Sequence, residues 1–137
     1  MNQESVALAV SKRVLIIEDE ENIQGILREF AKRFFEERGS KAGIKTMADS
    51  VRGLFELSTR GSDYDVIILD VRLPKLSGDE IYNSIALVNP DLLKRILFVT
   101  GYPDDLIQRW PDNHFNILGK PFPFDAFADA LNTVVEA

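Results

Sequence analysis

Short runs of consecutive apolar residues alternate along this chain with longer stretches in which apolar residues recur at helical spacing. Uninterrupted apolar runs are typical of strands buried on both faces of a parallel sheet, and the spaced stretches are typical of amphipathic helices. The alternation therefore predicts an α/β fold, a parallel sheet covered by helices on both faces. The five predicted strands are residues 14–17, 44–47, 66–70, 96–100 and 116–119.

The spaced stretches predict about five helices. Gly39 supplies a stop for the first helix, and Asp49 or Ser50 can cap the second. The fourth helix is expected to be short, because Pro103 favours its start and Pro111 prevents much continuation. The predicted helices cover about residues 23–37, 51–60, 78–88, 104–109 and 122–134.

Polar residues stand at the ends of four of these apolar runs. Glu18 and Asp19 follow the first run, Asp70 and Thr100 close the third and fourth, and Lys120 follows the fifth. Parallel strands would bring these ends to one edge of the sheet. Carboxylates gathered there repel one another and favour a hard divalent cation or a cationic side chain among them. Each residue alone has an ordinary explanation as a loop or turn residue, so the predicted site rests on their combination.

Composition narrows the class of protein. A chain of 137 residues with 45% hydrophobic content is expected to form one domain. Its net charge of −6 disfavours nonspecific binding to nucleic acid or to anionic membranes. The absence of cysteine excludes disulfides, thiolate metal sites and cysteine nucleophiles. No segment has the pattern of a signal sequence or a membrane span, so a cytoplasmic protein is expected.

Four motifs, in order and spacing, resemble those of the response regulator receiver domain, the phosphorylatable module of two-component signalling. The resemblance covers about residues 13–137 and leaves residues 1–12 as an N-terminal extension, whether a leader, a tether remnant or a disordered segment. It implies a flavodoxin-like, doubly wound sheet with strand order 2-1-3-4-5. The motifs are Leu15-Ile16-Ile17-Glu18-Asp19-Glu20, Asp70-Val71-Arg72-Leu73-Pro74 with Gly78, Val99-Thr100-Gly101 and Gly119-Lys120-Pro121-Phe122.

The resemblance also implies a magnesium site. Asp70 would accept the phosphoryl group and take part in binding Mg²⁺. Asp19 would be a direct metal ligand, Glu18 would act mostly through water, and the backbone carbonyl of Arg72 would complete the protein's share of the metal shell.

The remaining implied roles concern the phosphoryl group itself. The charge of a loose phosphoryl-transfer transition state lies mainly on the peripheral oxygens. Lys120 would supply a positive charge to these oxygens and Thr100 a hydroxyl hydrogen bond. The expected partners are a histidine kinase or histidine phosphotransfer protein as donor and an unknown downstream protein. The chain would be a regulatory phosphoacceptor and not an enzyme, either stand-alone or excised from a longer protein.

The chain departs from the family pattern in two places, and the first is the position of the aromatic switch residue. Many receivers carry an aromatic switch residue three positions before the lysine, where this chain has Ile117, and Phe115 is a candidate substitute. A pseudo-receiver that signals without phosphorylation is therefore the first alternative. A magnesium-dependent phosphatase is the second, although such enzymes typically place an aspartate where this chain has Arg72.

The segment after Thr100 is also unusual. Its short helix alters the surface that many receivers use to dimerise, so the usual dimer is not expected here. Two prolines predict that residues 101–113 change their order on activation. The bulky side chains of Arg72 and Tyr102 flank the path of attacking water in this family, and they predict slow self-dephosphorylation.

Overall fold

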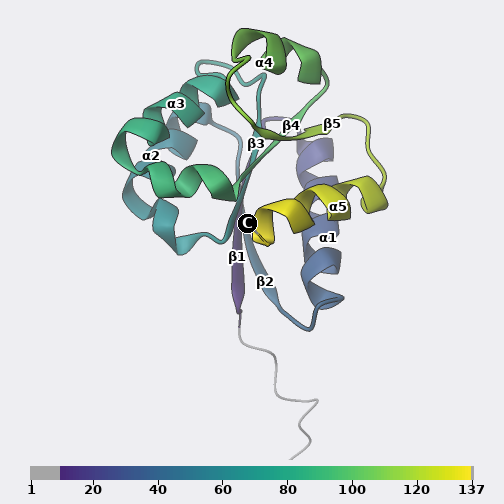
Figure 1. Ribbon diagram of the computed structural model, residues 1–137. Helices are drawn as coiled ribbons and strands as arrows, with labels where there is room; N and C mark the ends of the chain where they lie inside the picture. The colour runs from purple at the N-terminus through teal and green to yellow at the C-terminus, as the bar shows by residue number, and fades with distance from the viewer. Residues whose placement is uncertain (1–9, 137) are drawn as a thin grey trace, which may run out of the picture.

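A five-stranded parallel sheet forms the centre of the computed structural model, which describes residues 10–136 (Figure 1). The strand order β2-β1-β3-β4-β5 confirms the predicted topology. All five predicted strands are present at or within two residues of their expected bounds. They are β1 Lys12–Ile17, β2 Ala42–Met47, β3 Val66–Asp70, β4 Ile96–Thr100 and β5 Asn116–Gly119.

Five α-helices connect and follow these strands in the described part of the chain. The short fourth helix is confirmed, and it starts at Pro103, whose fixed φ suits a first helical position. Two short 3-10 helices, Gly61–Asp63 and Pro90–Arg95, were not predicted. The α-helices are α1 Glu21–Glu36, α2 Ser50–Arg60, α3 Gly78–Val88, α4 Pro103–Arg109 and α5 Phe124–Val135.

The strands bury both of their faces, which explains their uninterrupted apolar sequences. In β1, Val14 and Ile16 join the core under α1 and α5, whereas Leu15 and Ile17 join the core under α2 and α3. Figure 1 shows these helix pairs on opposite sides of the sheet. Because successive side chains of a strand point to opposite faces, one apolar run supplies both cores.

Local capping explains where several helices begin. The Asp49 carboxylate accepts hydrogen bonds from the backbone N–H groups of Val51 and Arg52, so Asp49 is the cap of α2. The other candidate cap, Ser50, is buried and instead donates its hydroxyl to the Pro74 carbonyl at 2.6 Å. Ser50 thereby ties the start of α2 to the loop between β3 and α3.

The start of β1 is tied to the segment before β2. The backbone N–H groups of Ser11 and Lys12 both donate to the Lys41 carbonyl, and β1 begins at Lys12. Most of the predicted extension, residues 1–9, lies outside the described residues, so the extension stays a prediction. Among the described helices, none has the length and apolar character needed to cross a bilayer.

Candidate functional site

The parallel register brings the polar strand ends to one edge of the sheet. Ile17, the last residue of β1, pairs with Leu69 of β3, so Glu18 and Asp70 follow these two residues at the same end of the sheet. Asp70 in turn pairs with Val99, the residue before Thr100. The Lys120 N–H donates to the Thr100 carbonyl at 2.8 Å, which fixes the loop after β5 at the same edge.

Three carboxylates form a compact cluster at this edge. Glu18, Asp19 and Asp70 each offer an oxygen within 4.8 Å of the other two. Glu18 and Asp70 are buried, with exposed fractions of 0% and 5%, whereas Asp19 is exposed. Hard oxygen ligands at this spacing, open to solvent on the Asp19 side, are suited to a divalent cation.

Lys120 is the cation that the fold itself places among these acids. Its Nζ lies 2.8 Å from Glu18 Oε1 and 3.6 Å from Asp70 Oδ2. Burial, together with a hydrogen bond to Asp70, nevertheless raises the pKa of Glu18 to about 8. Burial lowers the pKa of Lys120, but the bond to Glu18 and the charge of Asp70 outweigh it and leave that pKa above its usual value. One ammonium group therefore does not balance the cluster, and the donor set fits a bound Mg²⁺.

Two backbone N–H groups orient the other predicted site residues. The Arg72 N–H donates to Asp70 Oδ1 at 3.3 Å, and the Tyr102 N–H donates to the hydroxyl of Thr100 at 3.0 Å. Thr100 is buried beside Asp70 at the end of β4. The structure thus gathers the side chains of Glu18, Asp19, Asp70 and Lys120, and it places Thr100 at the end of the strand next to that of Asp70.

The start of α3 packs tightly against the end of β3. A Cβ atom on Gly78 would clash with the Asp70 carbonyl oxygen and the Val71 Cα, so only glycine fits there. The Gly78 N–H also donates to the Val71 carbonyl at 2.8 Å. Ser77 caps α3 in a capping box with Glu80, which was not predicted although the Ser-x-x-Glu spacing is its signature.

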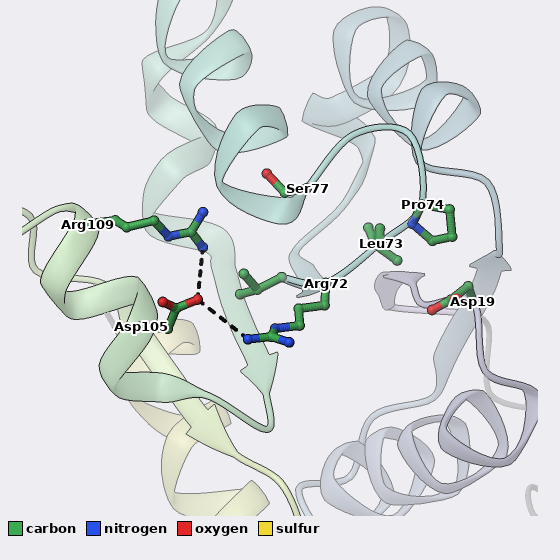
Figure 2. A pocket seen from close by; sticks show the side chains of 8 residues that line it. Asp19, Arg72, Leu73, Pro74, Ser77, Asp105 and Arg109 are labelled. Atoms are coloured by element: carbon green, nitrogen blue, oxygen red, sulfur yellow. Dashed lines mark ion pairs between the residues drawn. The ribbon is translucent and has the colours of Figure 1, made fainter.

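An open pocket of about 490 Å³ lies beside the acidic cluster (Figure 2). Asp19 lines one side of it, and Asp105 and Arg109 of α4 line the other, with Arg72 between them. Asp105 and Arg109 were not predicted as site residues, because charged residues on a short exposed helix carry no local signal of a site.

Phe115, the candidate substitute for the missing aromatic switch residue, packs among other aromatic side chains. The ring of Phe115 packs edge-to-face against Phe98 at 5.1 Å and against Tyr82 at 5.0 Å between ring centroids. Ile117 packs against the same core. Two aromatic neighbours therefore hold Phe115 on the α3 side of the sheet.

Comparison with known proteins agrees with this geometry. The family description of the response regulator receiver domain matches residues 14–132. The chain belongs to the response regulator receiver domain family. Within it, an uncharacterized response regulatory protein of Yersinia pestis is 30% identical over 120 residues, which are 87% of this chain and 46% of that protein. The sensor kinase CckA of Brucella abortus is 26% identical over 98% of this chain and 14% of the kinase.

Solved receiver structures share the fold. A receiver domain protein from Clostridium thermocellum has a TM-score of 0.74 at 24% identity, covering 91% of this chain and 94% of that one. The receiver domain of the Pseudomonas aeruginosa sensor histidine kinase PA1611, with a magnesium ion coordinated in its active site cleft, has a TM-score of 0.75 at 19% identity. These matches cover 94% of this chain and 100% of the PA1611 domain. This receiver domain spans less than half the length of the two relatives matched by sequence.

Proposed function

We propose that this receiver domain takes a phosphoryl group onto Asp70 from a histidine kinase or a histidine phosphotransfer protein and thereby changes its protein-interaction surface. The observation that carries the proposal is the arrangement around Asp70, a buried carboxylate 3.6 Å from the Lys120 ammonium and grouped with Glu18 and Asp19. A buried acid that faces both a cation and a metal-binding cluster is suited to receive an anionic group.

In the proposed reaction, an oxygen of Asp70 attacks the phosphorus atom of the donor's phosphohistidine. The new O–P bond forms as the P–N bond breaks, and the electron pair of that bond remains on the imidazole nitrogen, which takes up a proton. Lys120 and Thr100 stabilise the charge on the phosphoryl oxygens, one by its ammonium group and the other by its hydroxyl.

Glu18, Asp19 and Asp70 would hold Mg²⁺, together with the backbone carbonyl of Arg72. When bound, Mg²⁺ supplies positive charge that screens these carboxylates and the incoming phosphoryl oxygens from each other. The magnesium site of the PA1611 receiver supports this part of the proposal, as does the excess of carboxylates over cations here.

The similarity to CckA supports a histidine kinase pathway, and we propose a cytoplasmic location and a downstream protein as the target. The receiver acts as a regulator rather than as an enzyme with turnover. The phosphatase alternative is not favoured, since Arg72 stands where such enzymes carry a second aspartate. A pseudo-receiver would keep the fold without accepting a phosphoryl group.

Intact mass spectrometry after incubation with acetyl phosphate and Mg²⁺ tests the proposal. The wild-type chain is expected to gain the mass of one phosphoryl group, and Asp70→Asn is expected to abolish the gain. The matched control, Asp112→Asn, removes an exposed aspartate in a distant turn and should leave the gain intact. Chelation by EDTA should suppress the reaction. An unmodified wild-type chain would favour the pseudo-receiver instead.

A further inference from the structure

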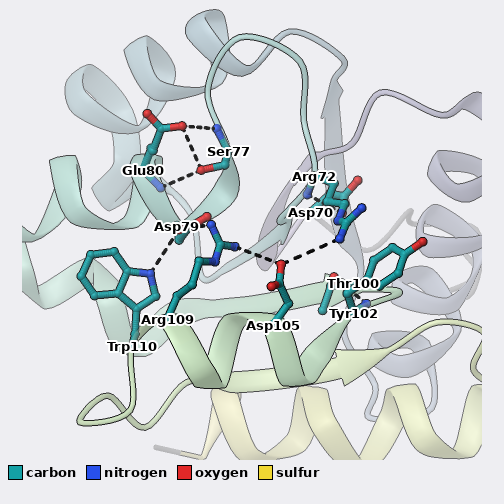
Figure 3. Close-up of polar contacts among 10 residues, drawn as sticks. All are labelled: Asp70, Arg72, Ser77, Asp79, Glu80, Thr100, Tyr102, Asp105, Arg109 and Trp110. Atoms are coloured by element: carbon teal, nitrogen blue, oxygen red, sulfur yellow. Dashed lines mark hydrogen bonds and ion pairs between the residues drawn. The ribbon is translucent and has the colours of Figure 1, made fainter.

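The buried Asp79 carboxylate holds the C-terminal end of helix α4 in place. Asp79, in the first turn of α3, is 4% exposed. Its Oδ2 accepts a hydrogen bond from the indole N–H of Trp110 at 3.1 Å and lies 3.0 Å from the Arg109 guanidinium (Figure 3). Losing these contacts would be costly, since it would leave the buried Asp79 carboxylate without a partner, although Arg109 itself is about two-fifths exposed. This end of α4 is therefore anchored.

The N-terminal end of α4 is held by a different and weaker set of contacts. The guanidinium of Arg72 lies over the ring of Tyr102, 3.6 Å from its centroid, and 3.8 Å from the Asp105 carboxylate (Figure 3). Arg72 and Asp105 are about half exposed, and Asp105 shares its carboxylate with Arg109 at 3.8 Å. Exposed pairs at this distance contribute little to stability, so a stronger anion can displace Asp105 from Arg72.

A phosphoryl group on Asp70 would be such an anion. The Arg72 N–H already donates to the Asp70 carboxylate, so the Arg72 side chain starts two residues from the acceptor, beside the pocket of Figure 2. Arginine presents a planar set of donors that matches phosphoryl oxygens, and a doubly charged group attracts it more strongly than a carboxylate does.

We propose that Arg72 is a second cationic ligand of the phosphoryl group, alongside Lys120, and that Asp105 competes with the phosphoryl group for it. This inference rests on the proposed function of Asp70. Transfer of Arg72 from Asp105 to the phosphoryl group frees the first turn of α4, while Asp79 keeps the end near Trp110 in place. The helix thus pivots about its C-terminal end, and the phosphorylated form presents a different α4 surface.

If Asp105 and the phosphoryl group compete for Arg72, substitutions of Asp105 and of Arg72 should have opposite effects on binding of a phosphoryl mimic. The probe is beryllofluoride with Mg²⁺, a phosphoryl mimic, and its binding to the full chain is followed by fluorine NMR. Asp105→Asn is expected to tighten binding, because Arg72 then has no competing carboxylate, and Arg72→Gln is expected to weaken it. Each change should be about two- to fivefold, the size expected of one exposed ion pair. Asp104→Asn is the matched control, since it removes the same charge from the neighbouring exposed position.

Amide hydrogen exchange gives a second readout on the same samples. Beryllofluoride should speed exchange at Tyr102 and Asp105 of the wild-type chain, whose N–H groups are hydrogen-bonded at the start of α4. It should leave exchange unchanged at Trp110 and Asn113, whose N–H groups donate at the other end of the helix. The unliganded Arg72→Gln and Asp105→Asn chains should already show the faster exchange.

The two proposals fail in different ways. A wild-type chain that gains no phosphoryl mass and binds no beryllofluoride overturns both of them. A chain that gains the mass but in which Asp105→Asn and Arg72→Gln bind beryllofluoride like Asp104→Asn overturns only the assignment of Arg72. Uniform exchange changes along residues 101–113 would overturn the pivot.

Discussion

Single residues in this receiver owe their chemistry to position more than to type. Glu18 is an ordinary glutamate in sequence, yet burial beside Asp70 raises its pKa to about 8. Asp19, the next residue, is exposed. Two adjacent acids thus differ in solvation because Glu18, directly after β1, is still buried, whereas Asp19 lies beyond the buried segment. The same contrast separates Asp79, buried against Trp110, from the exposed Asp105.

We expect the residues beside Asp70 to set the lifetime of the proposed phosphorylated state. The guanidinium of Arg72 lies over the ring of Tyr102, a contact between these two bulky side chains that the sequence did not predict. We expect slow self-dephosphorylation in the wild-type chain, because the stacked pair screens the anhydride from in-line water. Arg72→Ala and Tyr102→Ala should each shorten the lifetime several-fold, measured by the decay of phosphoryl mass after acetyl phosphate is removed. A lifetime that stays the same in both variants would contradict the screening role.

At the scale of elements, the junction between β3 and α3 depends on the missing side chain of Gly78. Gly78→Ala is expected to destabilise the fold by about 1–3 kcal/mol, because the added Cβ would meet backbone atoms of Asp70 and Val71. Gly25→Ala is the matched control within α1, where no atom lies within 4 Å of the added Cβ. It should stabilise the fold by about 0.5–1 kcal/mol. Urea denaturation measures both, and equal effects would contradict the packing argument.

A buried hydrogen bond joins α2 to the turn before β3. The hydroxyl of Tyr64, which is 3% exposed, donates to the Glu56 carboxylate at 2.5 Å, and Lys45 lies 3.5 Å from the same oxygen. The bond from Tyr64 holds the pKa of Glu56 below its usual value, even though burial acts in the opposite direction. The folded state therefore favours the ionised form of Glu56.

This link predicts a pH-dependent loss of stability. A carboxyl whose pKa is lowered by folding stabilises the native state above its unfolded pKa of about 4.5, and that stability is lost as pH falls through the folded value. Tyr64→Phe should cost about 1–3 kcal/mol at pH 7, and the difference from wild type should shrink in acid. Urea denaturation at pH 7 and at pH 3.5 measures this difference in the free energy of unfolding.

Tyr82→Phe is the control, since no hydrogen bond of the Tyr82 hydroxyl is found within residues 10–136. A cost of Tyr64→Phe that does not change with pH would contradict the role of Glu56.

At the scale of the whole molecule, the site exists because the sheet joins distant parts of the chain. Lys120 and Glu18 are 102 residues apart in sequence and 2.8 Å apart in space. The chain carries a net charge of −6, and three of its acids meet at this one edge. A fold that concentrates negative charge there is stabilised by any cation that binds the folded chain and not the unfolded one.

Local sequence patterns predict the strands of this fold and the edge of the sheet where the polar residues meet. Uninterrupted apolar runs predicted all five strands, because a strand buried on both faces has no polar positions to alternate with. The polar residues at the strand ends predicted the edge where they meet, because parallel strands share one direction. The strand order itself came from the family resemblance, since no local pattern says which strands are neighbours.

Tertiary structure decided what no local pattern could carry. The sequence determined which residues stand at the ends of buried strands, because burial and helix spacing follow from nearby residues alone. The packing of α3 against α4 decided that Asp79 is buried and that it binds both the Trp110 indole and the Arg109 guanidinium. It also decided that the Arg72 side chain lies over Tyr102. These contacts join side chains whose partners lie on other elements, and so their energies arise only once the chain has folded.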